Sequence, residues 1–151
     1  MKNGPRFLVA VAIAGCFACG QPFVSSNVAN DPDIILLHIG TNDSYMSGAG
    51  GAPMRLETLV DMILSAYPDT LLVVAQIVPY PSQASNIDSL NATIPALVES
   101  RASMGKHIVM ADLNTGFVTS TMLSNDTIHP NKTGYDFMGD AFYSVIGDLL
   151  H

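Results

Sequence analysis

Three short apolar runs constrain the fold of this chain most. They are "IILLHI" (34–39), "LLVVAQI" (71–77) and "HIVMAD" (107–112), and they are almost evenly spaced. Each is rich in aliphatic residues and does not alternate with polar ones, which is typical of parallel strands covered on both faces. We therefore expect three strands of one parallel sheet.

Apolar residues at helical spacing lie between and after these runs. The stripes fall within residues 56–64, 87–98 and 135–149, and Pro95 interrupts the second, so that helix is expected to kink or to start late. Alternating strands and helices predict an α/β fold, a three-layer α/β/α sandwich of the flavodoxin-like, doubly wound kind. In such sheets ligands bind beyond the carboxyl ends of the strands.

The N-terminal segment has two interpretations. Lys2 and Arg6 precede the apolar run "FLVAVAIA" (7–14), and "IAGC" (13–16) resembles a bacterial lipobox. This pattern predicts a signal segment over 1–20, a linker over 21–31 and one domain over 32–151, with a secreted product or one anchored by a lipid on Cys16. The same apolar run also has the composition of a parallel strand.

Whether residues 7–14 form a signal segment or a strand decides what lies beside the run at 34–39. With no further strand beside it, this run would be an exposed hydrophobic edge, which natural sheets avoid. We therefore expect low stability of the isolated chain, dimerisation through that edge, or coverage by residues 5–16 as a fourth strand.

Charge and histidine spacing exclude several functions. The 151 residues carry a net charge of −7 with only six Lys and Arg and no basic run, which argues against nucleic acid as a partner. His38, His107, His129 and His151 show no metal-ligand spacing. We read His38 and His107 as packing residues inside strands. The pair Cys16 and Cys19 has no second CxxC and no nearby His to complete a zinc site.

"NDTIHPNKTGY" (125–135) could supply acid–base chemistry. Asp126 lies three residues before His129, on a loop that Pro130 stiffens. A histidine can take a proton from a nucleophile near neutral pH, provided that a partner fixes its tautomer. We predict that His129 is the base and that Asp126 orients it. An Asp that caps a turn beside an exposed His is the simpler alternative.

"HIGTND" (38–43) could supply the complementary group. The side-chain amide of Asn42, just beyond a rigid strand, would be a preorganised donor to an oxyanion. Gly40 would allow a sharp turn, and Asp43 would brace it by bonding nearby backbone N–H groups. An ordinary turn would explain the same residues. Tyr45 and Tyr80, on loops near this edge, could stack on a sugar.

Together these motifs resemble those of the SGNH (GDSL-type) hydrolase family. "PDIILLHIGTND", "NATIPALVESRASMGKHIVMAD" and "HPNKTGYDFMGDAFY" are similar to secreted carbohydrate esterases that remove acetyl groups from xylan. The resemblance runs from about Pro32 to the C-terminus. It implies an esterase acting on an acetylated polysaccharide or a small ester, without a cofactor, with Asn42 as oxyanion donor, His129 as base and Asp126 as its partner.

The chain departs from this family at the nucleophile. The family's serine lies in a G-D-S motif at the end of its first strand, and this chain has no G-D-S. The nearest candidates are Ser25, Ser26 and Cys16. We expect an N-terminally shortened SGNH fold, a truncated gene product or degenerate paralogue with little turnover. The alternative is a secreted or lipid-anchored protein that binds carbohydrate without cleaving it.

Overall fold

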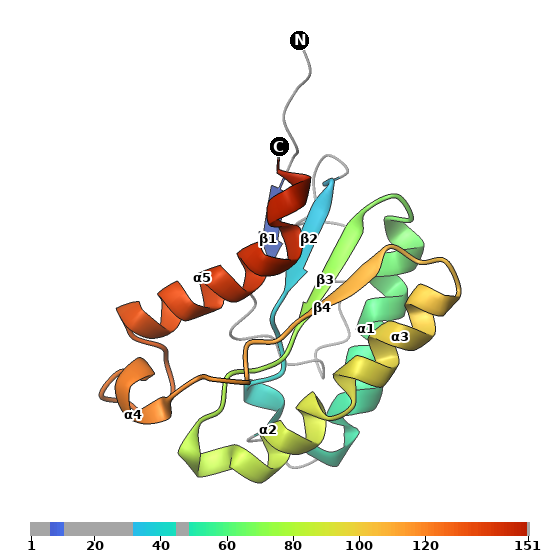
Figure 1. The fold of residues 1–151 in the computed structure, drawn as a ribbon. Coiled ribbons are helices and arrows are strands. Elements are labelled where there is room, and N and C mark those ends of the chain that lie inside the picture. The colour runs from blue at the N-terminus through green and yellow to red at the C-terminus, as the bar shows by residue number, and fades with distance from the viewer. Residues whose placement is uncertain (1–6, 11–31, 45–48, 151) are drawn as a thin grey trace.

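The computed structural model describes residues 7–10, 32–44 and 49–150 (Figure 1). Its four-stranded parallel sheet has the order β1-β2-β3-β4. The strands are β1 (Phe7–Ala10), β2 (Ile34–Leu37), β3 (Leu71–Ala75) and β4 (Ile108–Ala111). The last three fall within the three predicted runs, which confirms the parallel α/β sheet.

Helices cover both faces of this sheet, with α1 and α3 on one side and α5 on the other (Figure 1). The α-helices are α1 (Ala52–Ala66), α2 (Ala84–Asn91), α3 (Ile94–Ser103), α4 (Thr119–Met122) and α5 (Lys132–Ile146). Four short 3₁₀ turns are η1 (Asn42–Ser44), η2 (Ala49–Gly51), η3 (Pro81–Gln83) and η4 (Gly147–Leu149). Pro95 lies in the first turn of α3, so the stripe at 87–98 is divided into α2 and α3.

Successive side chains of β2, β3 and β4 enter opposite cores, as the pleat requires. Ile35 and Leu37 of β2 join a core with α1, α2 and α3. Ile34 and Leu36 join a second core, to which α5 contributes Met138 and Ile146. Both faces of the sheet are therefore apolar, which is why its strands appear in the sequence as unbroken hydrophobic runs.

Strand β1 bears on the predictions for the N-terminal segment. Phe7 to Ala10 pair in register with Ile34 to Leu37. The edge of β2 is thus occupied by β1. We predict dimerisation through this edge only if no further strand lies beside β2, so that prediction does not apply to the described sheet. The targeting segment, the linker over 21–31 and the lipid on Cys16 stay predictions, since most of these residues lie outside the described part of the chain. Among the described helices, none is long and apolar enough to cross a bilayer.

Candidate active site

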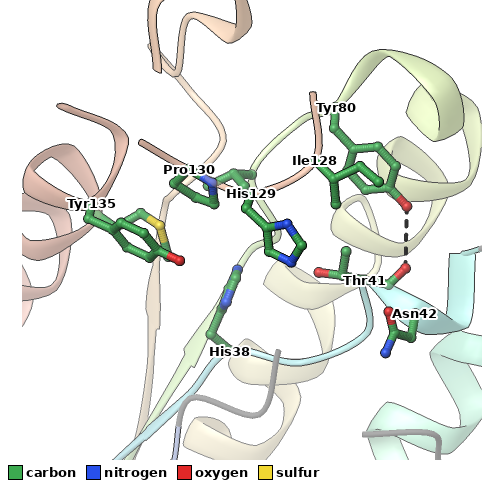
Figure 2. A pocket seen from close by; sticks show the side chains of 10 residues that line it. His38, Thr41, Asn42, Tyr80, Ile128, His129, Pro130 and Tyr135 are labelled. Carbon is green, nitrogen blue, oxygen red and sulfur yellow. Dashed lines mark hydrogen bonds between the residues drawn. The ribbon is translucent and has the colours of Figure 1, made fainter. Parts of the chain in front are cut away.

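A cavity of about 150 Å³ lies beyond the carboxyl ends of β2 and β3 (Figure 2). Its lining comes from the segment after β2, the segment after β3, the loop before α5, and α5 itself. The lining residues are His38, Thr41, Asn42, Val78, Tyr80, Ile128, His129, Pro130, Tyr135 and Met138. The structure therefore brings Asn42 and His129, which are 87 positions apart in "HIGTND" and "NDTIHP", to one pocket.

Asp126 binds the loop and the imidazole at the same time. Its Oδ1 accepts hydrogen bonds from the backbone N–H groups of Ile128 and His129, both at 2.9 Å. Its Oδ2 lies 2.6 Å from His129 Nδ1. The two backbone N–H groups and then the imidazole lower the pKa of Asp126 to about 2, so it is ionised near neutral pH.

This arrangement defines the tautomer of His129. An ionised carboxylate can only accept, so Nδ1 carries the proton and the lone pair lies on Nε2. The His129 side chain is 53% exposed, so a ligand in the pocket can reach it. The predicted orienting contact between Asp126 and His129 is thus present, while the catalytic roles of both residues stay predictions.

The loop between these residues has an unusual backbone. Thr127 has φ 59°, in the left-handed region that β-branched residues rarely adopt. Thr127 lies within the turn in which one oxygen of Asp126 accepts from both Ile128 and His129. Strained backbone of this kind clusters at functional sites, because the surrounding contacts must hold it in place.

Asn131 fixes the other end of the loop. Its Oδ1 accepts from the Gly134 N–H at 3.1 Å and caps α5. Its Nδ2 donates to the carbonyls of Thr121 and Leu123 at 2.9 and 3.0 Å. A side chain at Gly134 would clash with the Met122 carbonyl, so glycine is required there. These contacts join α4, the His129 loop and α5 into one unit.

The turn after β2 carries Asn42. Gly40 has φ 118°, and a Cβ there would lie 2.8 Å from Leu90 and 3.0 Å from Ile77, so the backbone passes where only glycine fits. Asn42 begins η1 and lines the cavity, and its side-chain amide makes no hydrogen bond to another described residue.

Asp43 holds this turn through a side-chain partner and not through backbone N–H groups. Its carboxylate is buried and accepts from Arg55 of α1, with Nε at 3.1 Å and Nη2 at 2.8 Å. The prediction that it bonds nearby backbone N–H groups is wrong for the contacts described. Arg55 instead ties the Asn42 turn to a helix, and nothing in the local sequence marks such a partner 12 residues away.

The segment after β3 is held by Asn91. Its Oδ1 accepts from the Ile77 N–H and its Nδ2 donates to the Ile77 carbonyl, both at 2.8 Å. Tyr80 is only 1% exposed, and its hydroxyl donates to the Thr41 carbonyl at 3.3 Å. Tyr80 is therefore a wall of the pocket, and the prediction that it stacks on a sugar is wrong. Tyr45 lies outside the described residues.

Two further residues line the pocket for which the sequence predicts no role in a site. Tyr135 of α5 is 46% exposed at the cavity, although its spacing marks it as part of the apolar stripe. His38 is buried, as its place in an apolar run predicts, but it also lines the cavity. The other strand-like histidine, His107, is exposed, so its assignment to the core is wrong.

A nucleophile is missing from the described part of this pocket. None of the described lining residues is a serine or a cysteine. Ser25, Ser26 and Cys16, the candidates nearest in sequence, lie outside the described residues. The described residues thus place an imidazole, its carboxylate partner and a side-chain amide at the pocket, and their catalytic roles stay predictions.

Known proteins share these features of sequence and fold. Residues 18–137 match the GDSL-like lipase/acylhydrolase family. The chain is 32% identical over 135 residues to a putative endoglucanase X of Acetivibrio thermocellus, a match that covers 85% of this chain and 58% of that protein. It is 31% identical over 126 residues to a multidomain esterase of Ruminococcus flavefaciens, covering 79% of this chain and 16% of the other.

Solved structures agree in fold. A family 3 carbohydrate esterase from Clostridium thermocellum has a TM-score of 0.69 at 31% identity, covering 79% of this chain and 58% of that one. One from Talaromyces cellulolyticus has a TM-score of 0.71 at 26% identity, covering 79% and 59%. The chain therefore spans less than two thirds of each of these proteins. Its sequence match and its fold agree with the resemblance seen in its motifs: the chain belongs to the GDSL-like lipase/acylhydrolase (SGNH) family.

Proposed function

We propose that this chain carries the acid–base and oxyanion part of an esterase that removes acetyl groups from O-acetylated carbohydrate. The observation that carries the proposal is the 2.6 Å contact between Asp126 and His129 beside a pocket that Asn42 also lines. The relatives support the substrate class, because they include carbohydrate esterases and an acetyl esterase crystallised with an acetate ion.

The reaction follows from the tautomer of His129. Nε2 accepts the proton of a hydroxyl nucleophile, whose oxygen then attacks the acetyl carbonyl. The amide N–H of Asn42 donates to the oxyanion that forms. When the intermediate collapses, the ester C–O bond breaks and the leaving sugar oxygen takes the proton from His129. Water then repeats the sequence and releases acetate. No cofactor is needed.

The family resemblance assigns the nucleophile to a serine, which would reach the pocket from outside the described residues. In its absence a water molecule could take the same place, with His129 accepting its proton. Removing the nucleophile from such a site leaves a rate of roughly 10³-fold to 10⁴-fold over water, from the oxyanion donors and binding alone. We therefore expect this chain to be a slow esterase.

The size of the cavity supports a small acyl group. Pockets for drug-sized ligands occupy roughly 300–1,000 Å³. This cavity, at about 150 Å³, is well below that range. This volume suits an acetyl group and the adjoining part of a sugar better than a long acyl chain.

Acetate release from acetylated xylo-oligosaccharides tests the proposal. We expect slow release by the chain, and a further loss of roughly 100-fold in Asn42→Ala, because one oxyanion donor is removed. His129→Gln should lose activity as well. Release no faster than in buffer, or an unchanged rate in Asn42→Ala, would overturn the proposal.

A fluorophosphonate probe locates the nucleophile. It reacts only with an activated hydroxyl or thiol, and peptide mass spectrometry identifies the labelled residue. Labelling of Ser25, Ser26 or Cys16 would mean that the chain carries its own nucleophile and is not truncated at its functional centre. No labelling, together with slow acetate release, would agree with a chain that lacks one.

The pocket composition favours a second candidate, a carbohydrate-binding protein without turnover. The observation that favours this candidate is that no described residue lining the pocket is a serine or a cysteine. Binding of an acetylated oligosaccharide with neither acetate release nor labelling would support this candidate. An oriented base would then have no use, which is why we place the esterase first.

Export is part of either proposal. A secreted or lipid-anchored product would have access to polysaccharide outside the cell. The mass of the N-terminal peptide from the expressed protein tests this directly, because a lipid on Cys16 would add the mass of its acyl chains. An unmodified Met1 peptide in the soluble fraction would overturn it.

A further inference from the structure

His38 is the first residue after β2, and it lies on the α5 side of the sheet. Side chains alternate along the extended chain, and Leu37 and Ile39 belong to the core with α1 and α3. His38 therefore points the other way, to the cavity that Tyr135 and Met138 of α5 also line. Figure 2 shows its ring rising toward the space beside His129.

The ring of His38 is buried without a polar partner. The residue is 4% exposed, and neither Nδ1 nor Nε2 makes a hydrogen bond to any residue that the structure describes. An unsatisfied buried polar group costs roughly 1–3 kcal/mol, and most such groups in native proteins have a partner. A packing residue would not need the two nitrogens, so packing does not explain this histidine.

Burial decides the charge of this ring. Desolvation lowers the pKa of His38 to about 4, so the imidazole is neutral near pH 7. A neutral imidazole has one N–H donor and one acceptor nitrogen. The other titratable groups that line the pocket are His129, Tyr80 and Tyr135, and the Tyr80 hydroxyl is bonded to Thr41.

We propose that His38 is a ligand-binding residue that hydrogen-bonds a free hydroxyl group of the ligand beside the ester. The identity of the ester rests on the proposed function. A hydroxyl can both donate and accept, so it satisfies the nitrogen that faces the pocket in either tautomer of the ring. A carbonyl or carboxylate can only accept and would fit one tautomer alone.

The surroundings of His38 favour one polar contact rather than many. Val78 and Met138 give the cavity apolar walls, while Asn42 and His129 are the groups assigned to the ester itself. A hydroxyl next to the acetylated position of a sugar would therefore find its partner in His38. His38 thus sets a preference for partly acetylated carbohydrate over an ester with no neighbouring hydroxyl.

Two small esters of matched size test this preference. 2-Hydroxyethyl acetate carries a hydroxyl where propyl acetate carries a methyl group, and NMR titration of the whole chain gives both dissociation constants. We expect the hydroxyl ester to bind several-fold to tenfold more tightly, since one net hydrogen bond has about that effect.

Three variants assign the preference to His38. His38→Leu should bind both esters equally, because it keeps the bulk and removes both nitrogens. His38→Gln, which keeps a donor and an acceptor, should retain part of the preference. His107→Leu, the same change at an exposed histidine, should behave like the unmodified chain.

Several results would overturn the proposal. Equal binding of the two esters by the unmodified chain, no binding of either ester, or the same preference in His38→Leu would each do so. A histidine with only a structural role would change stability in His38→Leu without changing the ratio. Binding is measured without turnover, so the two proposals can fail separately. A preference that depends on His38 would stand even if no acetate were released. Acetate release would likewise stand even if the two esters bound equally.

Discussion

Acid should unfold this chain partly by charging one buried ring. Between its ordinary pKa of 6.5 and its folded pKa of about 4, His38 binds a proton in the unfolded chain and not in the folded one. Stability rises with pH wherever the unfolded state binds more protons. The free energy of unfolding should therefore fall as the pH is lowered from about 6.5 toward about 4.

The size of this effect follows from the two pKa values. At about pH 4.5 the linkage contributes roughly 2–3 kcal/mol against folding, and near pH 7 it contributes almost nothing. His38 should thus account for about 2 kcal/mol of stability lost over this interval. That is a large share of the roughly 5–15 kcal/mol typical of a folded domain.

Urea unfolding at the two pH values measures this loss. Carboxylates also titrate in the interval, so the useful quantity is the difference between the unmodified chain and His38→Leu, whose other groups are the same. We expect the unmodified chain to lose about 2 kcal/mol more than the variant. His107→Leu, at an exposed ring, should lose as much as the unmodified chain. Equal losses in His38→Leu and the unmodified chain would refute the reasoning.

Three further changes test how His129 is held. Asn131→Ala should lower the free energy of unfolding in urea by about 2 kcal/mol, because a helix cap and further hydrogen bonds are lost. The control Asn125→Ala, at an exposed residue, should change it by no more than about 0.5 kcal/mol. Gly134→Ala should cost about 1–3 kcal/mol despite alanine's higher helix propensity, because its Cβ meets backbone; an unchanged midpoint would contradict this. Asp126→Asn should leave the fold intact but remove the single Nδ1–H tautomer of His129 from the ¹⁵N spectrum, and an unaltered spectrum would contradict that assignment.

Elements of the fold with a repeating local pattern could be predicted from the sequence. The strands β2, β3 and β4 are covered on both faces, so each appears as an uninterrupted apolar run. Helix α5 appears as a stripe at helical spacing. The division of one stripe into α2 and α3 could be anticipated from Pro95, although the two helix ends could not.

Contacts between distant side chains left no such pattern. Asn91 reaches Ile77 across 14 positions, and Arg55 reaches Asp43 across 12. His38 sits in an apolar run, and only the structure shows that it faces a cavity and not a core. By contrast, Asp126 and His129 lie three positions apart, so the sequence alone could pair them.

The attachment of the His129 loop has a consequence for motion. Asn131 bonds α4 and caps α5, so the loop is tied to these helices rather than to the sheet. Asn42, in contrast, follows β2 and is tied to α1 through its neighbour Asp43. A small slide of α5 along the sheet would carry the imidazole toward or away from the amide without breaking any bond within either unit. The distance between the two groups across the pocket therefore depends on how α5 packs against the sheet.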